Sequence, residues 1–444
     1  MKSLVGLFAI SITIFSLIGC TSGVTVKSTN PLHDGITVMK LTLIEDHYGG
    51  QHIVGEIRND ASFPLKSIKL SISITDTDGE TVLKDFDEKP ITEDSFSPFL
   101  GILFPGQSTG FEYSLSPLTN TAAHYQVSFL SAVKMDSQQA DVRIEKAHIQ
   151  DSMYGTSFFI GEVVNLGSQP ARVEGMGVAI LGDNGQILDM NFASSLVQYL
   201  APANDPDGLD RGTFAIPLRG SFGERVHWQT YLSSIVTTPG NVPAVKLLES
   251  RHYVDSMGYF HLVGLVSNQS SISYFFPLIG NVTDEDGNIL DSVTGYLPID
   301  LQADSVAAFD LMDWKVVNHN TDLQGLIKKT QIQIDSSRAY PSKLHYFNLI
   351  TSNVQEYRDT QGLWKFTGFV DNFWPVPFQS VVVIVSIFSG KNHLVATGYQ
   401  WVQPVASMLG VGSKAQFDLQ ISLDPTRDPS KYTYQIQALA EPPW

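Results

Sequence analysis

The sequence of 444 residues predicts an all-β protein made of four tandem β-sandwiches behind a short apolar leader. Three observations predict this class. One unit recurs four times along the chain, and inside each unit apolar residues alternate with polar ones. No segment after the leader shows the 3.6-residue apolar period of an amphipathic helix. We therefore expect few helices.

The leader comes first. Residues 1–19 contain Lys2 followed by an apolar run of about 16 residues, which suits a secretory signal peptide and is short for a membrane span. The run ends at Cys20, the single cysteine of the chain. With one thiol, the sequence allows neither an intramolecular disulfide nor a cysteine-based zinc site. Residues 20–34 form a polar tether.

The segment Leu17-Ile18-Gly19-Cys20 resembles the lipobox of bacterial lipoproteins. The resemblance implies that the leader is removed, that the Cys20 thiol receives diacylglycerol and that the new amino terminus can be acylated, for example with palmitate. Several chains anchor firmly, at about 0.8 kcal/mol per buried CH₂. Position 21 holds Thr21, where the lipoproteins retained in the inner membrane carry an aspartate. Outer-membrane sorting is therefore expected if two membranes are present. Certain archaeal lipoproteins carry a similar box, and the alternative is a buried cysteine after an uncleaved helix.

A six-residue motif marks the repeats. VGEIRN begins at Val54, and IGEVVN, VGLVSN and TGFVDN follow with their glycines 106, 103 and 104 residues apart. This period is the size of one seven-strand sandwich. The resulting units are repeat 1 (35–138), repeat 2 (139–243), repeat 3 (244–341) and repeat 4 (342–444), joined by linkers near 138, 243 and 341. Placed end to end, they would reach roughly 140 Å.

Further landmarks keep the same phase. Each repeat has a tight turn about 20 residues after the motif asparagine and a later strand with a phenylalanine. The turns are Asp78-Gly79, Asn184-Gly185, Asp286-Gly287 and Ser389-Gly390, and the phenylalanines are Phe111, Phe214, Phe309 and Phe417. Between them, residues 68–75 alternate apolar and polar, which predicts a strand with one buried face. The run 380–388 is continuously apolar, which predicts a strand covered on both faces.

The repeats resemble the FxLYD-type and related immunoglobulin-like envelope domains. These share a V-G-x-V-x-N strand, a short loop ending in proline, an alternating strand, an acidic turn, and then Pro-Gly before an aromatic strand. Ser73–Gly79 and Phe104–Tyr113 carry the likeness in repeat 1, whereas repeat 4 lacks the acidic turn. The resemblance implies seven-strand immunoglobulin-like sandwiches of a mostly non-catalytic kind.

Composition and motifs argue against several functions. The formal net charge is −17, with no basic cluster, so nucleic acid is not an expected partner. The sequence has no G-x-S-x-G, P-loop or H-E-x-x-H motif, and its 11 histidines lack metal-ligand spacing. We therefore expect no cofactor and no enzymatic activity, although a hydrolase assembled from distant residues stays open. Asp205, Asp207 and Asp210 form an acidic loop that is the candidate for a cation.

The motif glycine and asparagine invite a binding-site interpretation. A strand glycine more often marks a bulge or a close approach, and an asparagine at a strand end more often caps a turn. We expect these structural roles. Asn268 and Asn281 also match glycosylation sequons, which we regard as a minor alternative.

Repeat 4 differs in its aromatic content, with 16 of the 47 aromatic residues. Its loop 372–378 supplies three candidate partner-binding residues, Phe373, Trp374 and Phe378, because large aromatics dominate interfaces. The alternative is that Trp374 covers its own sandwich or packs on repeat 3.

These observations predict a membrane-anchored, extracytoplasmic envelope lipoprotein with a non-enzymatic structural or interaction role. Its partners would be the bilayer, through Cys20, and an envelope protein or glycan. The alternative is a carbohydrate- or peptide-binding module that uses the aromatics of repeat 4.

Overall fold

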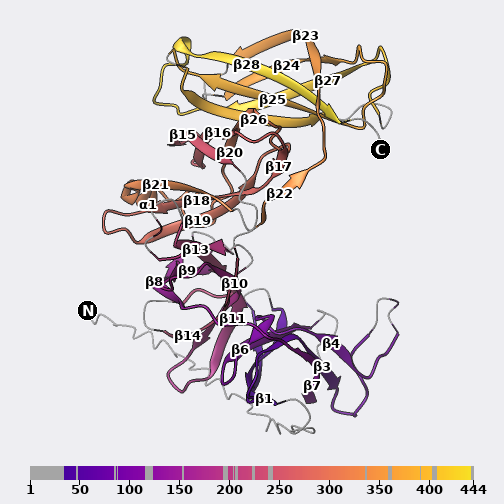
Figure 1. Cartoon of the computed structure of the whole chain (residues 1–444), viewed down its shortest axis with the longest axis vertical. Helices are drawn as coiled ribbons and strands as arrows, with labels where there is room; N and C mark the ends of the chain where they lie inside the picture. Colours follow the sequence, from indigo (N-terminus) through magenta and orange to yellow (C-terminus); the bar gives the residue numbers. More distant parts are fainter. Residues whose placement is uncertain are drawn as a thin grey trace, which may run out of the picture.

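In a computed structural model, the chain is built almost entirely of β-strands (Figure 1). The structure describes residues 35–441 apart from 47–48, 85–86, 88, 116–123, 153–154, 194–198, 204, 206–208, 223–225, 239–243, 336–337, 359–362, 391 and 403–407. These residues form 28 strands, one α-helix (α1, Thr321–Leu326) and one 3-10 turn (Pro429–Lys431). The all-β prediction is confirmed. The leader, Cys20 and the tether lie outside the described residues.

Repeats 1 and 2 each form two antiparallel sheets around an apolar core. In repeat 1 the sheets are β1-β2-β6 and β4-β3-β5, with β7 also paired to β3. In repeat 2 they are β13-β9-β8 and β11-β10-β12, with β14 also paired to β10. The strands of repeat 1 are β1 (Ile36–Glu45), β2 (Gln51–Asn59), β3 (Leu65–Thr75), β4 (Asp94–Phe96), β5 (Ile102–Leu103), β6 (Ser108–Ser114) and β7 (His124–Lys134). Those of repeat 2 are β8 (Val142–Asp151), β9 (Ser157–Asn165), β10 (Ala171–Leu181), β11 (Ile187–Phe192), β12 (Tyr199–Leu200), β13 (Arg211–Pro217) and β14 (His227–Val236).

Repeats 3 and 4 vary this plan. Repeat 3 has the sheets β15-β16-β20 and β19-β18-β21, and β17 pairs with β22. Repeat 4 has six strands in one path, β26-β25-β28-β23-β24-β27, which folds into two layers because β23 pairs first with β28 and then with β24. The strands are β15 (Val245–Val254), β16 (Phe260–Asn268), β17 (Ser273–Phe275), β18 (Pro277–Thr283), β19 (Ile289–Tyr296), β20 (Val306–Leu311), β21 (Lys329–Ile334), β22 (Tyr340–Ser342), β23 (Phe347–Arg358), β24 (Leu363–Asp371), β25 (Ser380–Phe388), β26 (Leu394–Val402), β27 (Lys414–Ser422) and β28 (Thr433–Glu441).

The repeats stack face to face. The β1-β2-β6 sheet contacts β10, β11 and β14 of repeat 2, strands β9 and β13 contact β19 of repeat 3, and β15, β16 and β20 contact β26 of repeat 4. Figure 1 shows the resulting column, with repeat 1 at the bottom and repeat 4 at the top. The chain is thus a pile of eight sheet layers. Because packed sheets lie about 10 Å apart, the pile measures about 70 Å between its outer layers, half of the end-to-end estimate.

Burial follows from the stacking. Every residue of β9 is buried, because its sheet has its own core on one face and repeat 3 on the other. The run Val381–Val385 of β25 is buried for the same reason, as its lack of alternation predicts. By contrast, residues along β24 and β27 alternate between buried and more exposed positions, because their sheet is the outer layer of repeat 4. A continuous apolar strand therefore marks an inner layer.

The tight turns agree with the sequence in three repeats. Gly79, Gly185 and Gly287 all have positive φ, as hairpin turns require. Repeat 4 differs, because the residue with positive φ is Asn392 (58°), two positions after the predicted Gly390. The predicted third linker also contains a strand, β22, which pairs with β17 of repeat 3.

Candidate functional site

The motif asparagines hold the loops that follow them. Asn165 is fully buried, donates to the carbonyl oxygens of Gln169 (2.9 Å) and Ala201 (2.8 Å), and accepts from the Gly167 N–H (3.0 Å). The other three repeat this pattern, at Asn59, Asn268 and Asn372. Each amide ties its loop to a segment more than 30 residues farther along the chain, so the expected capping role is confirmed. Asn268 and Asn281 are buried and offer no accessible sequon.

The motif glycine faces the phenylalanine of the neighbouring strand in every repeat. The cross-strand pairs are Gly55 with Phe111, Gly161 with Phe214, Gly264 with Phe309, and Gly368 with Phe417. A Cβ at Gly161 would lie 2.8 Å from the Phe214 ring, so a side chain does not fit. Two landmarks that are about 50 residues apart in sequence therefore form one packing unit.

The structure separates the three predicted partner-binding residues. Phe373 is 70% exposed at the tip of the loop. Trp374 is 42% exposed, while its indole N–H donates to the Asn348 carbonyl (3.0 Å) and its ring packs against Phe347. Phe378 is fully buried in the core of repeat 4. The prediction that Phe378 lies on a partner surface is wrong, because its backbone pairs with Leu409 and its ring is buried in this core.

The acidic loop of repeat 2 gains no support as a cation site. Asp210 pairs with Arg211 at 3.5 Å, and Asp207 lies outside the described residues. The Asp205 backbone N–H bonds to Pro202. Across the described part of the chain, no three His, Cys, Asp or Glu side chains gather closely enough to hold a metal ion.

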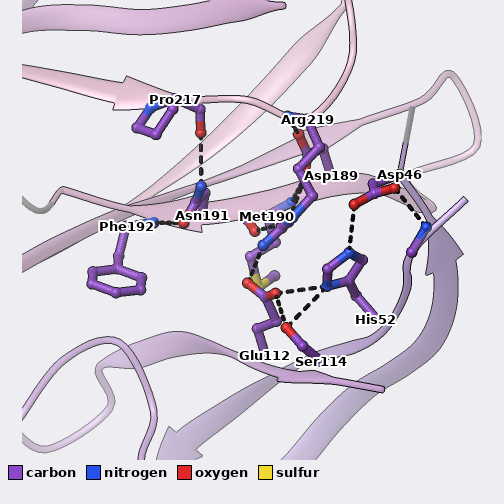
Figure 2. A network of polar contacts seen from close by, with 11 residues as sticks. Asp46, His52, Glu112, Ser114, Asp189, Met190, Asn191, Phe192, Pro217 and Arg219 are labelled. Atoms are coloured by element: carbon purple, nitrogen blue, oxygen red, sulfur yellow. Dashed lines mark hydrogen bonds and ion pairs between the residues drawn. The ribbon is translucent and has the colours of Figure 1, made fainter. Parts of the chain in front are cut away.

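A partly buried polar network joins repeats 1 and 2 (Figure 2). Arg219 donates to Asp189 at 2.8 Å and also binds Glu112, whose other oxygen lies 2.8 Å from His52 Nδ1. The far ring nitrogen of His52 lies 3.1 Å from Asp46. The positive charge of Arg219 thus lies between the carboxylates of Glu112 and Asp189 in a partly buried position.

A second histidine lies between repeats 3 and 4. His261 is 4% exposed, with Nδ1 2.9 Å from Asp310 and Nε2 3.5 Å from Asp255. Burial alone would lower the pKa of His261, but its hydrogen bonds to the two carboxylates raise the pKa to about 9. Tyr253 stacks on the ring at 4.6 Å and donates to the Ser422 carbonyl of repeat 4.

These two histidines occupy the same place in their repeats. Each stands three residues before the motif glycine, and its carboxylate partner follows the motif phenylalanine. In repeat 2 these positions hold Phe158 and Ala215, which pack in an apolar cluster against repeat 3. Metal-ligand spacing does not reveal this pairing of histidine and carboxylate, whereas an alignment of the four repeats does.

Repeats 3 and 4 also leave an open cleft of about 350 Å³ between them. Its residues come from β20, from the face of β25 and β28, and from the segment that joins the two repeats. None of its lining side chains is charged. Where the structure is described, no helix is long and apolar enough to cross a bilayer.

No protein-family model matches the chain, and no curated protein does. Similar solved structures include a calcium-binding mutant of Bacteroides uniformis beta-glucuronidase 2, at 11% identity over 62% of this chain and 29% of that one, with a TM-score of 0.11. Dimeric latent PorU from Porphyromonas gingivalis is 10% identical over 91% and 32%, with a TM-score of 0.13. Escherichia coli alpha-2-macroglobulin activated by porcine elastase is 10% identical over 92% and 44%, also with a TM-score of 0.13. The chain spans less than half the length of each.

Proposed function

We propose that the chain is an extracytoplasmic lipoprotein of the cell envelope, held on the bilayer by acyl chains on Cys20. In this proposal its role is structural or in protein interaction, without catalysis. The observation that carries the anchor is the single cysteine at the end of an apolar leader of about 16 residues. If the cell has two membranes, Thr21 favours the outer one.

The stacked architecture supports a spacer role. Adjacent repeats share buried surfaces, such as the Arg219 network and the Tyr253 contact with Ser422, so the joints resist bending. Repeat 1 follows the tether, and repeat 4 stands at the opposite end of the column (Figure 1). A chain anchored at Cys20 would therefore present repeat 4 away from the membrane.

The anchor is tested by Cys20→Ser in cells fed an alkyne fatty acid. We expect the variant to lose the label and to leave the membrane fraction, because the thiol is the acceptor of the diacylglycerol. Ser22→Ala is the matched control and should remain labelled. Labelled, membrane-bound Cys20→Ser would contradict the proposal.

The non-enzymatic part has its own test. The purified full-length protein should release no product from panels of chromogenic glycosides, esters and peptides. Turnover that co-purifies with the chain and is abolished by one point substitution would overturn it.

Carbohydrate or peptide binding by the repeat 4 aromatics is the second candidate. The exposure of Phe373 and Trp374 on one loop favours it. On a glycan array, Trp374→Ala should then abolish binding, whereas Trp228→Ala, which removes a similarly exposed tryptophan from repeat 2, should not. An array without any binding would remove the glycan form of this candidate.

A further inference from the structure

One side of the cleft between repeats 3 and 4 is formed by an edge strand, β20. Ser305 and the first three residues of β20, Val306 to Ala308, line the cleft. The floor is one face of β25 and β28, where Ser386 lies opposite Gln435 and Ile384 opposite Gln437. The cleft is thus an uncharged slot between a strand edge and a sheet face.

The register decides which backbone groups face the slot. The Asn268 N–H donates to the Ser305 carbonyl, so Ser305 and every second residue after it bond to β16. The intervening residues, Val306 and Ala308, direct their N–H and C=O groups away from β16. Among the described residues, none of these four backbone groups has a hydrogen-bond partner. The edge of β20 is therefore open for pairing.

In repeats 1 and 2 the equivalent strands have a hydrogen-bond partner at this edge. In repeat 1 the Gly110 carbonyl accepts from the Phe99 N–H at 2.9 Å. In repeat 2 the Arg211 carbonyl accepts from the Gln333 amide at 3.3 Å. In repeat 4 the contact lies farther along the strand, where the Asp418 N–H, at the position of Asp310, donates to Gln400 Oε1 at 2.8 Å. Proteins usually protect strand edges, and the open edge beside a cavity is unlike its counterparts in repeats 1 and 2.

We propose that this cleft binds an extended, uncharged peptide segment, which adds to β20 as a further strand. The backbone of the segment pairs with Val306 and Ala308, and alternate side chains rest on the floor near Ile384 and Leu439. A charged segment is excluded, because the slot offers no counter-charge and burying an unpaired charge is costly. The site deepens the proposed interaction role but depends neither on Cys20 nor on Trp374.

Binding is measured with the full-length protein in detergent. The probe is a synthetic library of capped heptapeptides that alternate Val or Ile with Ser or Thr. We expect at least one peptide to bind and to slow hydrogen exchange at the Val306 and Ala308 amides at least tenfold. The same peptide with N-methylated backbone amides should not bind, because it cannot pair with an edge.

A proline substitution tests the edge itself. Ala308→Pro removes an outward N–H without removing a bond to β16, so the sheet should survive while peptide affinity falls at least tenfold. Gln416→Pro is the matched control, since Gln416 precedes the motif phenylalanine in β27 as Ala308 does in β20. It should leave the affinity unchanged. Val306→Pro is the second variant, and thermal melting checks that each variant is folded.

Four results would overturn the proposal. These are no peptide binding, binding that survives both β20 prolines, binding of cellohexaose or maltohexaose in place of peptides, and dimer formation of the chain that Ala308→Pro abolishes. Release of Cys20→Ser from the membrane bears only on the anchor. A chain that binds peptides but carries no lipid would refute the anchor and leave the cleft assignment standing.

Discussion

Gly264 shows how tightly single residues are constrained in this chain. Its backbone faces the Phe309 ring on one strand and the Glu249 carbonyl on the other. The neighbouring strand bulges at this level, between Leu247 and Glu249. No side chain larger than hydrogen fits there, so the glycine keeps the aromatic ring within the core.

Gly264→Ala should destabilise the protein by about 3 kcal/mol, because its Cβ would lie 2.5 Å from Phe309 and overpacking of this kind is not relieved. Urea unfolding measures the loss. Gly325→Ala, in α1, is the control. It meets open space and should be neutral or stabilising by up to about 1 kcal/mol. Equal effects of the two substitutions would refute the packing explanation.

His261 should make stability depend on pH. Its folded-state pKa of about 9 lies above the unfolded value near 6.5, so the stabilisation is complete below about pH 6.5 and is lost as the pH rises through 9. The difference between the two pKa values corresponds to about 3 kcal/mol. Unfolding at pH 6.5 and 9.5 should show this loss in the wild type and not in His261→Gln. The exposed His227→Gln should behave as the wild type.

Whether the role of a residue could be predicted from sequence depends on how close its partners lie along the chain. Asn165 and Gly167 are two residues apart, so the capping role could be predicted from sequence. Arg219 reaches Glu112 across 107 positions and a repeat boundary, and no linear pattern predicts such a partner. Phe378 was misplaced for a related reason, since a loop sequence does not show which aromatic turns inward.

Among the elements, β25 carries the clearest signal. Its unbroken apolar run predicts a strand covered on both faces, and the structure places repeat 3 on one face and the repeat 4 core on the other. The motif strand β9 is likewise buried throughout, although its sequence includes Glu162. Charged residues in a strand therefore do not prove an exposed face, because a neighbouring strand of the same sheet can supply the partner, here Arg211.

Aspartate scanning across β25 should be harmful on both faces. Val382 faces repeat 3 and Val383 faces the repeat 4 core, so Val382→Asp and Val383→Asp should each cost at least about 3 kcal/mol. Thermal melting detects the loss. Gln420→Asp on the outer face of β27, opposite Lys365, is the matched control and should change stability by less than about 1 kcal/mol. Tolerance of Val382→Asp would mean that repeat 3 does not cover this face.

At the scale of the molecule, the repeats and their order along the chain can be predicted, but their arrangement cannot. The repeat period predicts units of one size, which suggests a chain of beads. The stacking arises from apolar side chains that two repeats share, such as Val263 in the core cluster of repeat 4. Such sharing is a property of pairs of surfaces and leaves no mark at the linkers.

Distance measurements separate the two arrangements. Ser131→Cys and Gln420→Cys place exposed labels on the two outer layers, in a chain whose native thiol is removed by Cys20→Ser. Stacking predicts one narrow distribution of label-to-label distances at about 70 Å, from seven sheet spacings of about 10 Å. Energy transfer between fluorophores or spin-label spectroscopy measures it. A broad distribution extending past about 100 Å would indicate independent beads.

The exposed faces left by an incomplete stack affect how the protein is made. During synthesis the repeats emerge in order, and repeat 3 presents Tyr253, Val263 and Leu265 to water until repeat 4 folds against them. Each repeat thus covers the exposed apolar face of the repeat that precedes it in the chain. A chain truncated after repeat 3 would be aggregation-prone and protease-sensitive. The last repeat ends in an outer sheet whose strands alternate buried and exposed residues, so it needs no further repeat to cover it. Point substitutions will therefore reveal the roles of the repeats where deletions would mislead.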